Sequence, residues 1–283
     1  MDINQTYYQR VILTNLIDKV SFLANNVAGM AVKNAENYVK VDCGLPADTF
    51  NIIVLQNNRL NQSEEKELKK DIRHFQTKKF PMAFWYWEDG QDLSPILEDT
   101  ELAEAEMNVA MLANVDQLEP VVLAPEGFVI RQVSTAEDIR VFGEVLASLF
   151  HTSQESSSVR SYYEQLSSYP QLFSEKMKLY LGAYKEEIVS IGSLVFTKES
   201  VGIYDIATRS EYRGRGLGSA MFNFLVMEVQ KQKIPLCVLQ ASPDGINIYK
   251  RSGFQSVGQI KVFENRHLVE ELTYIVPLSN PFL

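Results

Sequence analysis

Apolar residues recur with both helical and strand periods in the first half of the chain. Ile12, Leu16, Val20 and Leu23 are spaced three or four residues apart, which predicts an amphipathic helix near the N-terminus. Further along, the pattern predicts a charged helix that is capped by Ser63. The expected strands cover residues 52–56, 81–87 and 104–112, and a short helix covers 93–97. The first half is therefore expected to mix α and β structure.

The second half alternates strands and helices more clearly. The expected strands are 128–133, 177–184, 187–197, 202–208, 236–239, 256–263 and 269–276, and the expected helices are 135–150, one ending before Pro170, 217–229 and 246–250. A serine-rich stretch, residues 151–159, is expected to be a loop between the first two helices. Asn265 and Arg266 are expected to reverse the chain, so that the last two strands form a hairpin.

Composition excludes several classes of protein. The chain has 283 residues, 46% of them apolar, so it can bury one large core or two ordinary ones. With 27 Lys and Arg against 36 Asp and Glu, the net charge is −9, which argues against nucleic acid or an anionic membrane as the partner. Cys43 and Cys237 are too few for a zinc ribbon or a disulfide scaffold. The chain has no signal-peptide pattern and no apolar stretch of membrane-spanning length, so we expect a soluble, cytoplasmic protein.

One segment, residues 204–220, carries recognisable chemistry. It is expected to be a strand, then a turn with glycines at alternate positions, then the start of a helix. Glycines let a ligand approach the backbone, and the first N–H groups of a helix have no acceptor within the helix, so such a turn binds anions. Arg213 and Arg215 add positive charge, which favours a diphosphate over a carboxylate.

Two common phosphate loops do not fit this turn. A P-loop requires a lysine after its last glycine, and none follows Gly218. A dinucleotide fold requires its glycines after the first strand of a parallel unit, whereas this turn follows the fourth strand of its half. The spacing Arg-x-x-Gly-x-Gly, at Arg213, Gly216 and Gly218, instead resembles the pyrophosphate-binding motif of the GCN5-related N-acetyltransferase (GNAT) superfamily, whose members bind acyl-coenzyme A.

A second segment strengthens the resemblance. About two dozen residues later the chain has a strand and a helix that ends in Tyr-x-x-x-Gly-Phe at Tyr249, Gly253 and Phe254, similar to the rest of the family signature. The resemblance covers residues 128 to about 276. It implies an α/β fold with a mixed sheet, the GNAT fold, in the second half of the chain.

The resemblance extends more weakly to the first half, which is similar to the degenerate, smaller α/β lobe of two-lobed members. Pro125 and Gly127 mark the joint, so we expect a GNAT-like lobe at residues 1–124 and a catalytic GNAT domain at 125–283. The first lobe lacks the Arg-x-x-Gly-x-Gly motif, and we expect it to bind no coenzyme A but to wall the acceptor pocket.

The resemblance also implies which residues hold the acyl donor. In this family the strand before the loop splays from the strand after it, and the pantetheine arm binds in the gap. The main chain of Ile206, Ala207 and Thr208 matches the pantetheine-binding positions, and Ser242 stands where many relatives place an asparagine that contacts the donor. The residues expected at the diphosphate are Arg213, Gly214, Arg215, Gly216, Leu217, Gly218 and Ser219.

Catalytic groups are only partly implied. Tyr249 matches the family's general acid, which protonates the departing thiolate, although an aromatic core residue is the alternative at this position. The position of the family's glutamate base falls near Gly202, which has no side chain, so no base is named. Glu199 and Asp205 are expected on a solvated face, with Asp205 opposite Ile206. His151 is the histidine expected nearest the acceptor.

Together these inferences predict an N-acyltransferase that moves acetyl from acetyl-coenzyme A to a primary amine of a small molecule, by direct attack in a ternary complex and without a metal. Two alternatives stay open, a non-catalytic coenzyme A-binding sensor or scaffold and a protein N-acetyltransferase. We expect no nucleic-acid or membrane partner and either a monomer or a homodimer.

Overall fold

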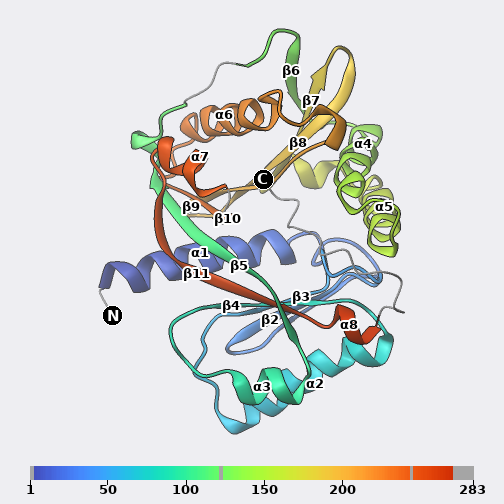
Figure 1. Ribbon diagram of the computed structural model, residues 1–283, viewed down its shortest axis with the longest axis vertical. Coiled ribbons are helices and arrows are strands. Elements are labelled where there is room, and N and C mark those ends of the chain that lie inside the picture. Colours follow the sequence, from blue (N-terminus) through green and yellow to red (C-terminus); the bar gives the residue numbers. More distant parts are fainter. Residues whose placement is uncertain (1–2, 121–123, 243–244, 270–283) are drawn as a thin grey trace.

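The computed structural model describes residues 3–120, 124–242 and 245–269 (Figure 1). Its strands form one eleven-stranded mixed sheet in the order β1-β2-β3-β4-β11-β5-β10-β9-β8-β7-β6, so the expected α/β fold with a mixed sheet is confirmed. The strands are β1 (Ala31–Asn34), β2 (Tyr38–Asp42), β3 (Ile52–Leu55), β4 (Ala83–Trp87), β5 (Ala103–Asn114), β6 (Phe128–Gln132), β7 (Met177–Tyr184), β8 (Glu187–Phe196), β9 (Ser200–Thr208), β10 (Leu236–Ala241) and β11 (Gln255–Glu264). The helices are α1 (Ile3–Ser21), α2 (Gln62–Lys78), α3 (Ser94–Asp99), α4 (Ala136–Ala147), α5 (Gln154–Leu166), α6 (Leu217–Gln230), α7 (Ile246–Arg251) and α8 (Arg266–Val269).

The sheet is continuous because each half of the chain contributes a long strand to the other. β5 comes from the first half, and its residues 109–114 pair with β10 of the second half. β11 comes from the second half, and its residues 260–264 pair with β4 of the first. β5 and β11 also pair with each other, antiparallel, and cross together between the two parts of the molecule in Figure 1. The division at residues 124 and 125 stays a prediction, but the halves cannot separate without breaking this pairing.

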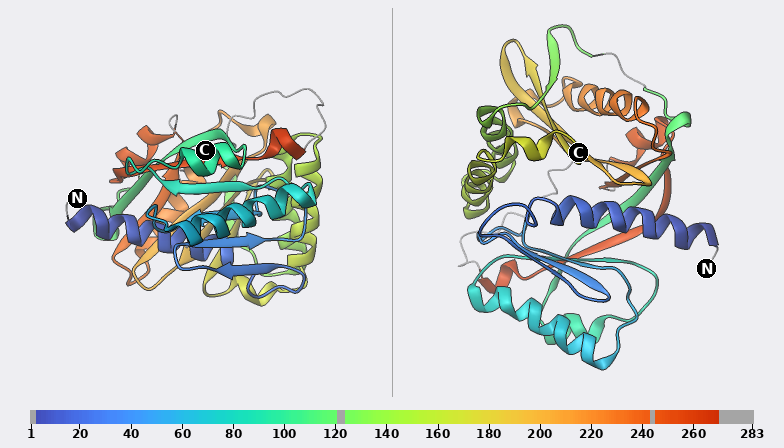
Figure 2. Two further views of the ribbon diagram at one scale, coloured as in Figure 1. Left: turned by 90° about the horizontal axis from the view of Figure 1, so that it is seen from below. Right: turned by 180° about the vertical axis from the view of Figure 1, so that it is seen from behind.

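Helix α1 is the second element that joins the halves. Its apolar stripe, including the fully buried Ile12, packs in one cluster with Ile52 and Trp87 of the first half and with Leu236 and Val238 of the second. Figure 2 shows this helix, in dark blue, lying between the two parts of the molecule. Burying one stripe against strands from both halves ties the position of α1 to both.

Helices cover both faces of the second half of the sheet. α4 and α5 pack on one face, where Phe142, Tyr163 and Leu166 meet side chains of β7, β8 and β9. α6 packs on the opposite face, where Met221 and Leu225 meet strands β8 to β10 and β5. The two faces of β9 therefore lie in different surroundings, one beneath α6 and the other beneath α1, α4 and α5.

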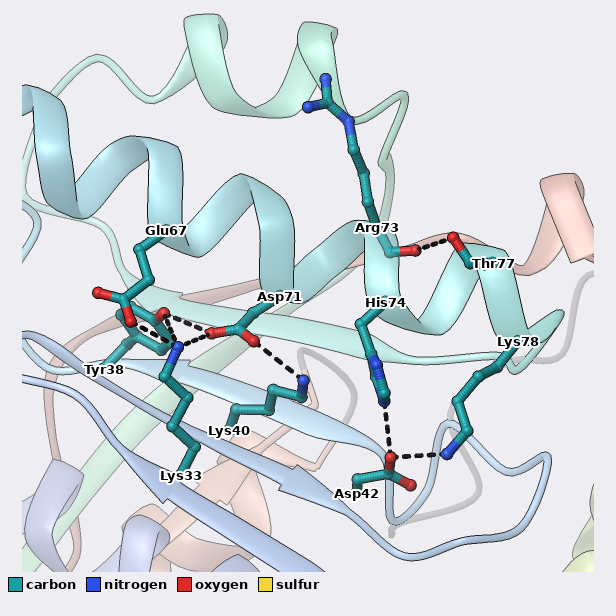
Figure 3. Close-up of polar contacts among 10 residues, drawn as sticks. All are labelled: Lys33, Tyr38, Lys40, Asp42, Glu67, Asp71, Arg73, His74, Thr77 and Lys78. Atoms are coloured by element: carbon teal, nitrogen blue, oxygen red, sulfur yellow. Dashed lines mark hydrogen bonds and ion pairs between the residues drawn. The ribbon is translucent and has the colours of Figure 1, made fainter.

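The hairpin of β1 and β2, which sequence patterning did not predict, is held to α2 by polar contacts (Figure 3). Asp71 accepts hydrogen bonds from Lys33 at 2.5 Å, Tyr38 at 2.6 Å and Lys40 at 3.0 Å. Burial alone would raise the pKa of Asp71, but these hydrogen bonds outweigh it and lower the pKa. The hairpin is therefore held by buried charge as well as by apolar packing.

A second carboxylate extends this contact to the end of the hairpin. Asp42 accepts from His74 at 2.9 Å and from Lys78 at 2.8 Å, both on α2 (Figure 3). Its other oxygen accepts from the backbone N–H of Gly44 at 2.9 Å, which fixes the start of the turn after β2.

Three details differ from the sequence-based expectations. The serine-rich segment is mostly helical, since Ser153 caps α5 by accepting from Ser156 N–H at 3.1 Å. Asn61 rather than Ser63 caps α2, because its side chain accepts from two N–H groups of the first turn. Asn265 and Arg266 were expected to form a tight turn, but the helix α8 begins at Arg266; the strand expected at 269–276 lies almost wholly outside the described residues, so the hairpin stays a prediction.

No helix in the described part of the chain is both long and apolar enough to cross a bilayer.

The turn after β2 meets α5 through a buried carboxyl group. Glu155, in the first turn of α5, is 1% exposed and accepts hydrogen bonds from the backbone N–H and the hydroxyl of Thr49, while its Oε2 has no partner in the described part of the chain. Buried Asp48, which pairs with Arg266, lies close by. Burial, reinforced by the charge of Asp48, raises the pKa of Glu155 to about 8. Glu155 therefore holds its proton in the folded protein at neutral pH.

We predict that Glu155→Gln removes a pH dependence of stability. The pKa of the Glu155 carboxyl is 4.5 in the unfolded chain and about 8 in the folded protein. Its contribution to stability is therefore full below pH 4.5 and is lost as the pH rises towards 8. The free energy of unfolding of the parent relative to the variant should fall by about 1–3 kcal/mol between pH 5 and pH 8.5 in urea titrations. The matched control Glu144→Gln, at a half-exposed glutamate of α4, should show no such trend. A constant difference for Glu155→Gln contradicts a protonated buried carboxyl.

Candidate functional site

The pairing between β9 and β10 stops halfway along β9. These parallel strands share only the register from Leu236 opposite Ser200 to Val238 opposite Gly202. Beyond that point β10 continues to pair with β5, and β9 continues to pair with β8. The two strands thus diverge, and β9 has no partner on its β10 side in the described residues after Gly202. This is the gap that the sequence resemblance implied.

A β-bulge in β9 lies where the strands diverge. Register with β8 shifts between Ser193, which faces Tyr204, and Ile191, which faces Ala207, and Asp205 has a positive φ of 55°. A bulge places an extra residue in one strand and re-aims the side chains around it. Here the Ile206 side chain enters the core beneath α6, whereas Tyr204 and Ala207 face the opposite side.

The glycine-rich turn leads from β9 directly into α6. Gly214 and Gly216 have positive φ values of 74° and 76°, which explains why glycine occupies both positions. Gly216 is the N-cap of α6 and supplies no side-chain cap, and the first intrahelical bond runs from Ala220 N–H to Gly216 O at 2.9 Å. The N–H groups of Leu217, Gly218 and Ser219 accordingly have no acceptor among the described residues, a geometry that is typical of anion-binding turns.

The two arginines of this turn are bonded to its own backbone. Arg213 Nε donates to Thr208 O at 3.2 Å, and Arg215 donates to Glu211 O at 3.2 Å. The Arg215 guanidinium also lies over the Tyr212 ring, 5.1 Å from its centroid. Neither arginine pairs with a carboxylate in the described part of the chain, so both keep N–H groups and full charge for an anion at the turn.

Ser242 and Tyr249 lie on the β10 side of the gap. Ser242 Oγ is buried and has no hydrogen-bond partner among the described residues, an arrangement that costs free energy unless another group, a ligand or water satisfies it. Tyr249, on α7, is 8% exposed and packs edge-on against Phe222, with ring centroids 5.0 Å apart. Burial raises the pKa of Tyr249 to about 12, so the phenol holds its proton at neutral pH. Tyr249 is therefore both a protonated donor and part of the core.

Asp205 is not on a solvated face, and the expectation that it would be is wrong. Its Oδ2 accepts a hydrogen bond from Ser193 Oγ at 2.5 Å and pairs with Lys19 of α1, and the Asp205 side chain is only 9% exposed. The bulge causes this, because it turns Asp205 towards the face that α1 covers. Glu199 is half-exposed as expected, and it pairs with Arg10.

Lys19, which pairs with Asp205 beside the gap, is a residue that sequence reasoning missed. It follows Ile12 by seven residues and Leu16 by three, so it lies on the apolar stripe of α1. A lysine on the buried stripe of an amphipathic helix needs a buried partner. That pattern could have predicted a buried carboxylate as the partner of Lys19, the role that Asp205 has in the structure.

Gly202 has no room for a side chain. A Cβ there would lie 2.1 Å from Asn15 Oδ1 and 2.2 Å from Tyr204 Cε2. Asn15 of α1 donates to Ser200 Oγ at 3.0 Å and accepts from the Tyr204 hydroxyl at 2.8 Å, so it fills this space. The first half of the chain therefore occupies the position where the family's glutamate was sought. His151 is exposed.

The arrangement fits an acyl-coenzyme A thioester. An extended gap with unpaired backbone leads to a turn of free N–H groups and two arginines, and an unsatisfied hydroxyl lies beside the gap. The structure brings together Ile206, Ala207 and Thr208 with the turn at one end of the gap. Their roles, and those of Ser242 and Tyr249, stay predictions.

Comparison with known proteins agrees with this geometry. Residues 145–270 match the family model described as an acetyltransferase (GNAT) domain. No curated protein matches the chain.

Solved structures share the fold over nearly the whole chain. A GCN5-related N-acetyltransferase from Kribbella flavida is 13% identical with a TM-score of 0.62, over 88% of this chain and 94% of that one. One from Sphaerobacter thermophilus is 14% identical with a TM-score of 0.54, over 92% and 91%. A tandem GNAT protein from the clavulanic acid biosynthesis pathway is 12% identical with a TM-score of 0.53, over 90% and 94%. At these identities the likeness concerns the fold.

Proposed function

We propose that this chain, which carries a GNAT acetyltransferase domain at residues 145–270, transfers an acyl group, most simply acetyl, from coenzyme A to a primary amine of a small molecule. The observation that carries the proposal is the divergence of β9 and β10 beside the uncapped N-terminus of α6. A thioester with an amide-rich arm and a diphosphate needs both features at once.

The donor is bound mostly by the main chain. The pantetheine amides hydrogen-bond to backbone groups of Ile206, Ala207 and Thr208, and the diphosphate accepts from the N–H groups at the start of α6. Arg213 and Arg215 add charge at the same turn. Ser242 Oγ, which has no partner among the residues that the structure describes, donates a hydrogen bond to the donor.

The reaction requires a neutral amine, a polarised carbonyl and a proton for the leaving thiolate. The amine attacks the thioester carbon in a ternary complex, so no covalent enzyme intermediate forms. A backbone N–H at the bulge polarises the carbonyl oxygen. As the C–S bond breaks, the Tyr249 phenol donates its proton to the sulfur, and the proton lost by the amine goes to water.

The sensor hypothesis shares the donor site with this proposal and differs only in turnover. We therefore test turnover directly, by incubating the protein with acetyl-coenzyme A and a library of small amines and measuring free thiol. Amine-dependent release supports the enzyme. Donor binding without release from any amine contradicts it and favours the sensor; release that requires a peptide amine favours the protein N-acetyltransferase.

Gly218→Ala should weaken donor binding without harming the fold. A Cβ at this position meets only Thr208 Oγ1, at an ordinary 3.4 Å, and alanine suits a helix better than glycine. The methyl group lies among the free N–H groups, so we expect coenzyme A to bind about 10- to 100-fold more weakly by calorimetry. Met227→Ala, at an exposed residue further along α6, is the control and should bind normally. An unchanged Kd in Gly218→Ala would place the diphosphate elsewhere.

Tyr249→Phe should slow the chemical step. Removing the proton donor should lower kcat about 100-fold or more at saturating donor, with the Kd for coenzyme A unchanged. Because the pKa of Tyr249 is about 12, the parent's rate should not decline through ionisation of this residue below about pH 11. A variant with parental kcat refutes the acid role and leaves Tyr249 as a core aromatic.

A further inference from the structure

We propose that the Lys19–Asp205 ion pair binds the acceptor, and that the acceptor is zwitterionic, carrying a carboxylate as well as the reacting amine, as an amino acid does. Asp205 binds the amine, which arrives as the ammonium and loses one proton to water before it attacks the thioester, and Lys19 binds the carboxylate. The inference rests on the proposed function, which it deepens by naming the substrate class.

The two faces of β9 decide where an acceptor can approach. On the α6 face, Ile206, Leu239 and Ala241 lie in one buried cluster with Tyr249, each 8% exposed or less. That face is filled by core side chains beside the gap. The Asp205 carboxylate points to the opposite face, beneath α1, so an amine that binds to it lies on that face of the bulge.

Asp205 and Lys19 are the charged pair on that face at the bulge. The ring of Tyr204 lies under the Lys19 ammonium, 5.7 Å from its centroid. The charge of Asp205 also raises the pKa of buried Tyr162 and Tyr163, secondary to burial, so these rings lie near it as well. The pair thus lies among aromatic rings, and both of its side chains are largely buried.

Both members of the pair have unused hydrogen-bonding capacity. Ser193 and Lys19 both bond to Oδ2 of Asp205, and no hydrogen bond from a described residue reaches Oδ1. The Lys19 ammonium has three N–H groups and, among the described residues, bonds to Asp205. An incoming ammonium and an incoming carboxylate can each bond to one partner without displacing the other.

Charge balance selects the acceptor class. The pair is neutral overall, and its members are only 9% and 18% exposed. A cationic acceptor would leave two positive charges for one carboxylate, and an anionic acceptor would leave the reverse; an uncompensated buried charge is costly. A zwitterion adds one charge of each sign, so every charge keeps a partner of opposite sign.

The test compares matched acceptors that differ only in the carboxylate. Thiol release is measured with glycine, L-alanine and L-phenylalanine and with their amides. For the best pair we expect kcat/KM at least about tenfold higher for the amino acid, although the amide's less basic amine is more often neutral. Lys19→Met should lower kcat/KM for the amino acid about 10- to 100-fold and leave the amide within about threefold.

Controls distinguish recognition of the acceptor from a purely structural role, in which the Lys19–Asp205 pair only holds α1 against β9; such a pair is called a structural clip below. Arg10→Met removes another ion pair between α1 and the β8–β9 hairpin, the half-exposed pair with Glu199, and should leave the amino acid to amide ratio unchanged. Lys19→Arg should restore much of the preference for the amino acid. Thermal melts establish that each variant is folded.

Three outcomes contradict the inference. If the parent protein acetylated the amides as efficiently as the amino acids, the acceptor's carboxylate would not be needed for binding. Equal losses for both acceptors in Lys19→Met would make the pair a structural clip. Thiol release from no amine, despite donor binding, would overturn the proposed function and this inference with it, whereas release without preference overturns this inference alone.

Discussion

The termination of β9–β10 pairing at Gly202 and Val238 is the constraint on which the candidate site depends. Both walls of the resulting gap are held from outside, β9 by β8 and β10 by β5 along its whole length. The gap therefore does not close by simple pairing, because each strand already has a partner in a different direction. The bulge at Asp205 adds to the divergence and separates the surroundings of successive side chains.

The first half of the chain contributes structure rather than a second motif. β5 forms the support for β10, and α1 supplies Asn15 and Lys19 to the face of β9 opposite α6. Exchange of β5 and β11 makes these contributions obligatory, because the halves share one sheet. The expectation that this half walls an acceptor site stays a prediction, and α1 is the element of this half that contacts the face of β9 opposite α6.

Local patterns predicted the elements well, and long-range contacts account for what they missed. The glycine-rich turn, its position between β9 and α6, and the order of elements in the second half follow from glycine spacing and periodicity. The strand exchange does not, because neither β5 nor β11 carries a local signal of its partner. Asp205 was misplaced for the same reason: strict alternation cannot anticipate a bulge. Lys19 could have been found, since a lysine on an apolar stripe requires a counter-charge.

Helix caps and turns were the other weak point. The serine-rich segment was expected to be a loop because serine is common in loops. Serine is also one of the preferred residues at a helix N-cap, and Ser153 is the N-cap of α5. Likewise, Asn265 was expected in a turn, but its side chain accepts from Met82 N–H at 2.8 Å and donates to Phe80 O at 3.0 Å. Contacts made across the sheet decided the conformation at that residue.

A crystal structure of the protein soaked with acetyl-coenzyme A tests the central claim most directly. The account predicts pantetheine as an extra strand-like segment between β9 and β10, with the diphosphate within hydrogen-bonding distance of the N–H groups of residues 217–219. A donor bound on another surface, or a gap closed by new pairing between β9 and β10, would contradict it.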